Sequence, residues 1–136
     1  MQVSATKLTV LRVALVVGLL LTLFWGIGGI LFPQQMHQSM TKEPFTPAFN
    51  AQYVITGGLV LGWTVAVLIA LRDIPRNLGI LNALIALSAI MFVVGIYTAV
   101  SVNPTEATAV GWATTILNLV LAVVLVVAYP RELASR

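Results

Sequence analysis

Four long apolar stretches fill most of this chain of 136 residues. They cover residues 8–32, 51–71, 78–102 and 108–129, and none has an ionisable residue near its middle. A helix needs about 20 mostly apolar residues to cross the hydrocarbon core of a bilayer. Charged residues make up only 8% of the chain, against about 25% in soluble domains. The sequence therefore predicts an integral membrane protein, with residues 1–136 forming one four-span domain.

The stretches are expected to be helices, because lipid cannot satisfy open backbone groups and the segments are too long and too uniformly apolar for barrel strands. A proline follows each of them, at Pro33, Pro75, Pro104 and Pro130, and proline is tolerated at helix boundaries. The turn at residues 72–77 is so short that the two stretches it joins must be antiparallel neighbours. The predicted fold is all-α, an antiparallel up-down-up-down four-helix bundle with an outer loop at residues 33–50.

The basic residues predict the orientation of this bundle. Six of the seven Lys and Arg residues flank the same side of the stretches: Lys7, Arg12, Arg72, Arg76, Arg131 and Arg136. Lys42 lies on the other side. Because cytoplasmic loops carry the excess of basic residues, we expect a multi-pass protein of the bacterial inner (cytoplasmic) membrane with both termini in the cytoplasm. The net charge of +3 is thus explained without a nucleic-acid partner, and the lipid bilayer is the expected surrounding.

Small residues at four-residue spacing predict where helices approach closely. The second stretch carries Gly58, Gly62 and Ala66, and the first carries Gly18 and Gly26. In lipid, helices associate largely through close van der Waals contact at such residues. We expect these stripes to face the interior of the bundle. The alternative is contact with another membrane subunit or with a second copy of the chain.

Few polar groups lie within the stretches, and they are the candidate ligand-binding residues. Asn118 is the main one, because an amide is costly to leave bare in hydrocarbon. Thr114, Thr64 and Asn82 are further candidates, and Trp63 lies deep enough either to pack in the core or to line a pocket. The alternative for the amides is hydrogen bonding between helices.

Several function classes are disfavoured by what the sequence lacks. There is no cysteine, and no nucleophile–base pair, carboxylate pair or nucleotide fingerprint, so neither an enzyme nor a cofactor is expected. Proton-coupled transporters usually need a carboxylate or histidine inside the membrane. The small multidrug exporters have this size, but they use a glutamate in their first span, and the first stretch here has none.

The segment of residues 33–50 is chemically the most varied. Met36, His37 and Met40 offer ligands that suit Cu(I), but on a helix His37 would point about 100° away from the face shared by the methionines. No metal site is therefore expected. The alternative is an interfacial helix whose Met side chains dip into the headgroup zone. Phe45 and Phe49 lie among prolines in residues 44–50, which suggests a loop folded back over the outer end of the bundle, where it is a candidate cap for a cavity between helices.

The layout resembles the small bacterial four-helix membrane proteins of the DoxX-like and BphX-like families. The matching parts are Leu11-Arg12 at the first stretch, WGIGGILFP at residues 25–33 and RDIPRN at residues 72–77. The resemblance implies an accessory subunit of a larger system and carries over no catalytic residue. Our hypothesis is a non-catalytic accessory or assembly subunit, or a protein that binds a lipid or hydrophobic ligand within the bundle. The alternative is an oligomeric channel for a neutral solute, which needs Asn118, Thr114 and Thr64 on one path.

Overall fold

A computed structural model describes residues 4–101 and 108–131, and this part of the chain is all-helical. The helices are α1 (Ala5–Leu31), α2 (Pro33–Met40), α3 (Pro47–Arg72), α4 (Leu78–Ser101) and α5 (Ala109–Val127). The four predicted stretches are confirmed as helices α1, α3, α4 and α5, each long and apolar enough to cross a membrane. Val102, Pro104 and Arg136 lie outside the described residues. The predicted outer loop at residues 33–50 contains a further helix, α2.

Side-chain caps explain where two of the helices begin. The hydroxyl of Thr46 accepts a hydrogen bond from the Phe49 N–H at 3.4 Å, and Pro47 occupies the first turn. Threonine caps and first-turn prolines are both favoured at helix starts. Helix α3 therefore begins four residues before the apolar stretch does. In α5, Thr108 caps in the same way, accepting from the Gly111 N–H at 3.2 Å.

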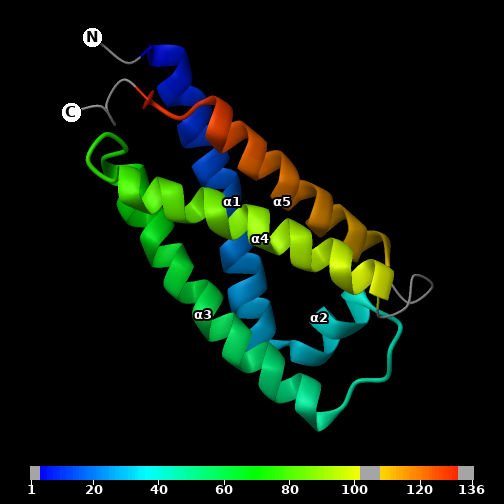
Figure 1. Cartoon of the computed structure of the whole chain (residues 1–136). Helices are drawn as coiled ribbons and strands as arrows, with labels where there is room; N and C mark the ends of the chain where they lie inside the picture. Colours follow the sequence, from blue (N-terminus) through cyan, green and yellow to red (C-terminus); the bar gives the residue numbers. More distant parts are fainter. Residues whose placement is uncertain (1–3, 102–107, 132–136) are drawn as a thin grey trace.

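The long helices run in alternating directions and form two closely packed pairs, α1 with α3 and α4 with α5 (Figure 1). Helices α3 and α4 meet at their shared turn and diverge away from it (Figure 1). The start of α1 and the end of α5 lie at the same end of the bundle as this turn, and we call it the terminal end. We call the opposite end, where α2 lies, the α2 end.

Glycines set the spacing of the pair α1–α3. A Cβ atom added at Gly57 would lie 2.8 Å from the Gly26 carbonyl oxygen, and one added at Gly29 would lie 2.9 Å from the Tyr53 carbonyl oxygen. The contact predicted at Gly26 is therefore present. Its partner is Gly57, one residue before the predicted stripe on α3.

The intrachain packing predicted for the other glycines is wrong. A Cβ atom added at Gly18, Gly58 or Gly62 would meet no other atom within 4 Å, and Gly58 and Gly62 are exposed while Ala66 is partly buried. The reason is the rotation of α3, whose buried face runs through Gly57, Thr64, Val67 and Ala70. This rotation turns the Gly58–Gly62 stripe away from the bundle.

The interior differs between the two ends. At the terminal end all four long helices share one apolar core, made by Leu11, Ala14, Leu15, Val67, Ala70, Ile74, Leu81, Leu84, Leu121, Leu125 and Ala128. At the α2 end, helix α2 contacts α1, α3 and α5. Met36 of α2 is only 5% exposed and fills the space beside Gly28, where an added Cβ atom would lie 2.7 Å from the Met36 sulfur. The headgroup-dipping position considered for this side chain is therefore wrong.

Candidate functional site

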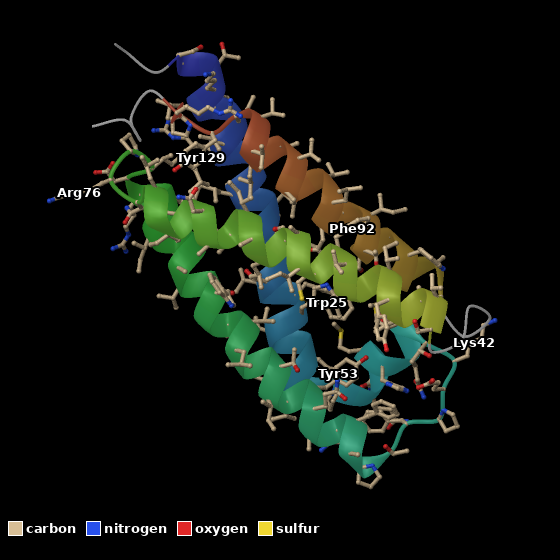
Figure 2. The ribbon with its side chains drawn as sticks, in the orientation of Figure 1. Trp25, Lys42, Tyr53, Arg76, Phe92 and Tyr129 are labelled. Atoms are coloured by element: carbon tan, nitrogen blue, oxygen red, sulfur yellow. The ribbon has the colours of Figure 1, made fainter. Side chains whose placement is uncertain are left out.

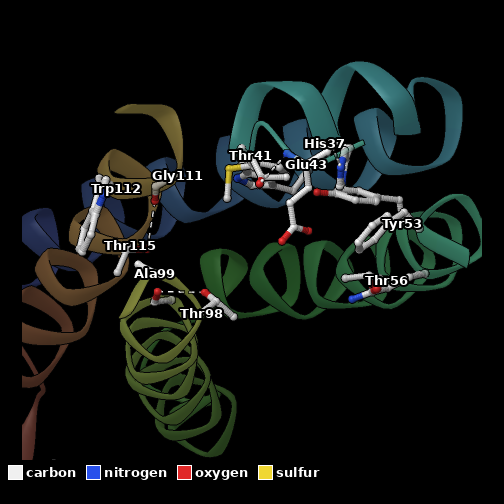
Figure 3. Close-up of a pocket in the computed structure, with 15 residues that line it drawn as sticks. His37, Thr41, Glu43, Tyr53, Thr56, Thr98, Ala99, Gly111, Trp112 and Thr115 are labelled. Carbon is white, nitrogen blue, oxygen red and sulfur yellow. Dashed lines mark hydrogen bonds between the residues drawn. The ribbon is translucent and has the colours of Figure 1, made fainter. Parts of the chain in front are cut away.

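A cavity of about 400 Å³ lies at the α2 end, and all five helices contribute to its lining (Figure 3). Ligand pockets in proteins commonly measure about 300–1,000 Å³. The lining residues are Trp25, His37, Met40, Thr41, Glu43, Phe49, Gln52, Tyr53, Thr56, Gly95, Thr98, Ala99, Gly111, Trp112 and Thr115. Phe49, considered as part of a loop that caps a cavity, belongs instead to helix α3 and forms part of the cavity wall, whereas Phe45 is not among the lining residues.

His37, the sole histidine of the chain, holds the α2 end together. It is only 1% exposed, and its ring centroid lies 4.4 Å from that of Phe49, 5.4 Å from that of Phe45 and 5.8 Å from that of Tyr53. Its Nε2 lies 2.9 Å from the Glu43 carbonyl oxygen. Because a carbonyl oxygen only accepts, Nε2 must carry the proton of this bond. His37 thus joins α2 to the segment that leads into α3.

Glu43 is fixed through its backbone on both sides. Its carbonyl oxygen accepts from His37, and its N–H donates to the Thr41 hydroxyl at 3.2 Å. The carboxylate is directed into the space between the helices (Figure 3). Within the part of the chain that the structure describes, this carboxylate has no ion pair and accepts no hydrogen bond. The backbone is therefore positioned, whereas the charged group is left available.

Helix α5 closes one wall of the cavity by docking on the end of α2. The Thr108 N–H donates to the Met40 carbonyl oxygen at 3.2 Å, and the Thr108 hydroxyl donates to the Ser39 carbonyl oxygen. Gly111 permits the approach, since a Cβ atom added there would lie 3.0 Å from the Met40 carbonyl oxygen. Gly111 and Trp112 are thereby brought into the lining.

The lining combines aromatic rings with polar groups of two kinds. The hydroxyls of Thr98 and Thr115 donate to carbonyl oxygens of their own helices, as is common for threonine within helices. In contrast, the side chains of Gln52, Tyr53 and Thr56 make no hydrogen bond to another described residue. Gln52 and Thr56 are exposed and Tyr53 is partly buried. Together with Glu43 they form a polar strip along an otherwise largely apolar wall.

A second hollow, of about 360 Å³, lies between α1 and α5 and has a different character. Apart from Thr9, its described lining is apolar: Val10, Val13, Ala14, Val17, Leu117, Val120, Leu121 and Val124. Such a groove offers a surface for acyl chains and nothing that would recognise a headgroup. The cavity at the α2 end is therefore the better candidate site.

The candidate ligand-binding residues named from the sequence do not line the α2-end cavity. Thr64 and Thr114 donate to the carbonyl oxygens of Val60 and Val110 in their own helices. Asn118 donates to the Thr114 carbonyl oxygen at 2.9 Å, also within its own helix. Trp63 packs against the apolar core, and Asn82 is exposed on α4. A ligand role for these five residues stays a prediction.

Met36, His37 and Met40, which were considered as metal ligands, each make a different contact. Met36 packs on α1, Met40 lines the cavity, and His37 is bonded to the Glu43 carbonyl. Among the described residues no group of three or more His, Cys, Asp and Glu side chains is placed to hold a metal ion.

Three members of the polar strip, Gln52, Tyr53 and Thr56, lie on α3 and are not among the candidate site residues predicted from the sequence. Phe49, Gln52, Tyr53 and Thr56 are spaced by three, one and three residues, which places them on one helical face. This spacing is a usable signal for the strip. The spacing is easily missed because the apolar stretch begins only at residue 51. Phe49 therefore falls outside the predicted helix that contains the other three residues.

Comparison with models of known protein families, with curated proteins and with solved structures finds no match. The resemblance to the DoxX-like and BphX-like families therefore stays a prediction, and the functional argument rests on the cavity.

Proposed function

We propose that this chain is a non-catalytic multi-pass protein of the cytoplasmic membrane that binds a lipid or another small amphipathic molecule in the α2-end cavity. The observation that carries the proposal is the polar strip of Glu43, Gln52, Tyr53 and Thr56, whose side chains make no hydrogen bond to another described residue. Polar groups that a bound molecule covers need a hydrogen-bonding partner. A molecule with a polar head and an apolar body satisfies both parts of this wall.

The distribution of basic residues supports an outward-facing cavity. Figure 2 shows Arg76 at the terminal end and Lys42 at the α2 end, and the other described cations, Lys7, Arg12, Arg72 and Arg131, flank the helices at the terminal end. The positive-inside rule assigns the terminal end to the cytoplasm. The cavity then lies in the outer half of the bilayer, and its lining includes the exposed residues Gln52 and Thr56 of α3 and Thr98 of α4, between which a molecule can enter from the outer leaflet.

Native mass spectrometry of protein extracted gently from its own membrane tests the proposal. Ala99 is buried in the cavity wall, so Ala99→Phe fills the cavity. Ala89 is exposed on the same helix and lies outside the lining, which makes Ala89→Phe the matched control. We expect the wild type and Ala89→Phe to retain an added lipid or small-molecule mass and Ala99→Phe to lose it. Equal retention by both variants, or no retained mass on the wild type, would contradict the proposal.

A second candidate function, that of an accessory subunit, is favoured by the exposed glycines of α3. Gly58 and Gly62 leave a shallow surface with no described atom within 4 Å of an added Cβ, and glycines spaced by four residues let a further membrane helix approach closely. We propose a helix of another membrane subunit as the occupant. The test is co-purification from the native membrane. Gly62→Leu should abolish it, whereas Gly79→Leu, at another glycine with open space, should leave it intact.

The channel alternative receives less support than ligand binding. It needs Asn118, Thr114 and Thr64 along one path, but none of the three lines the cavity. Each side chain donates instead to a carbonyl oxygen of its own helix. The geometry therefore favours binding over conduction.

A further inference from the structure

The α2-end cavity also carries information about the charge of its ligand. We propose that it selects an amphiphile with an organic ammonium head, which Glu43 and the surrounding aromatic rings recognise together. This inference rests on the proposed ligand-binding function and adds the chemical class of the ligand.

The first argument is the charge of the lining. Glu43 is the one carboxylate among the described lining residues, and no Lys or Arg is among them. The Nε2 proton of His37 is used by the Glu43 carbonyl oxygen. A carboxylate beside a largely apolar wall favours a cation and repels an anion. Fatty-acid-like anions are therefore disfavoured, and an ammonium group supplies the missing partner.

The second argument is the ring content of the same wall. Trp25, Phe49, Tyr53 and Trp112 come from three different helices and all line the cavity. Ring faces attract ammonium groups, with tryptophan the strongest, and aromatic enclosures are a common way to bind alkylated amines. The rings also provide the apolar surface that alkyl groups on the nitrogen require. Carboxylate and rings thus favour the same head.

The third argument is the fixed position of Glu43. The Glu43 N–H donates to the Thr41 hydroxyl and the Glu43 carbonyl oxygen accepts from His37, and both bonds hold the Glu43 backbone at the cavity edge (Figure 3). Neither bond uses the carboxylate. Because the backbone is already held, binding at the carboxylate costs no further backbone entropy. His37 is in this sense a positioning residue for Glu43.

Three probes, each with a chain of ten carbons, separate the contribution of the head from that of the tail: decyltrimethylammonium, decan-1-ol and decanoate. Binding to maltoside-solubilised protein is followed by tryptophan fluorescence in a Trp63→Phe background, where the two remaining tryptophans, Trp25 and Trp112, both line the cavity. We expect the ammonium probe to bind about tenfold more tightly than the alcohol, the factor that a partly desolvated cation–π contact typically supplies. Decanoate should bind most weakly.

Glu43→Gln should abolish the preference for the ammonium probe and leave alcohol binding unchanged. Glu43→Asp keeps the charge and should retain part of the preference, which guards against a folding defect in the first variant. Asp73→Asn removes the same charge from the α3–α4 turn at the far end and should change nothing.

The outcomes distinguish the two proposals. If the alcohol binds and Ala99→Phe blocks it, but Glu43→Gln leaves the ranking of the probes unchanged, the ammonium inference is wrong and the ligand-binding function stands. An equal affinity of the wild type for the ammonium and alcohol probes would overturn the ammonium inference in the same way. If no probe binds in a manner that Ala99→Phe abolishes, both proposals fail.

Discussion

A single histidine performs a structural task at the α2 end. His37 combines near-complete burial, three aromatic neighbours and one hydrogen bond to a backbone carbonyl. A lone histidine beside two methionines invites interpretation as a metal ligand. Its surroundings instead resemble those of a core residue whose polar atom is satisfied. The consequence for function is indirect, since His37 determines where Glu43 stands.

Replacing His37 should therefore weaken the fold. His37→Ala removes a buried ring and leaves the Glu43 carbonyl oxygen without its donor, so we expect the free energy of unfolding to fall by about 2–4 kcal/mol. His37→Phe keeps the ring and should lose about 1–2 kcal/mol. Unfolding in detergent with increasing sodium dodecyl sulfate measures both. Gln38→Ala, at the exposed neighbouring position, is the control, and a loss as large as that of His37→Ala would argue against this role.

At the scale of the elements, the pairing of α1 with α3 depends on which face α3 turns inward. Two adjacent glycines, Gly57 and Gly58, have opposite surroundings: one faces the Gly26 carbonyl oxygen and the other faces open space. Since helices in lipid gain little from burying apolar area against each other, close backbone approach becomes the main stabilising contact. The same rotation leaves the Gly58–Gly62 stripe available to a partner.

These neighbours form a matched pair for mutagenesis. Gly57→Ala places a Cβ atom 2.8 Å from a backbone oxygen, so α1 and α3 must separate. We expect a loss of about 1–3 kcal/mol in the free energy of unfolding. Gly58→Ala meets no atom and should be neutral or stabilising by up to about 1 kcal/mol through its helix propensity. The same detergent titration decides the matter, and equal effects at the two positions would show that the helix rotation is wrong.

At the scale of the whole molecule, the bundle is closed at one end and hollow at the other. The apolar core joins all four long helices at the terminal end, while α2 occupies the α2 end and leaves the cavity beside it. Helices α3 and α4 are held together by the tight turn between them, in which the Asn77 side chain donates to the Asp73 carbonyl oxygen at 2.7 Å. Divergence toward the α2 end follows from packing a polar helix between the two pairs.

The orientation of this asymmetric molecule in the membrane can be measured directly. The chain has no cysteine, so a maleimide can label only a cysteine introduced by mutation. We expect Gln38→Cys, exposed on α2, to react with a membrane-impermeant maleimide in intact spheroplasts. Arg76→Cys, in the α3–α4 turn, should react only after permeabilisation. The reverse labelling pattern would place the cavity on the cytoplasmic side and remove the outer-leaflet entry route.

The sequence by itself determined the number and the approximate bounds of the long helices. Their apolar runs have the length that a bilayer requires, and this constraint is local to each run. Helix α3 begins four residues before its apolar stretch, because the polar cap Thr46 extends the helix beyond its apolar part, whereas α5 begins and ends within its stretch.

Tertiary structure decided which side of each helix is used. Gly57 and Gly58 are adjacent glycines in the same apolar stretch, and only the rotation of α3 against α1 gives them different surroundings. Glu43 looks like an ordinary loop acid until contacts from Thr41 and His37 fix it at a cavity to which all five helices contribute. Helix rotation and the position of α2 depend on contacts between residues far apart in the chain. Hydropathy is a local property of neighbouring residues in the sequence, so it carries no information about such contacts.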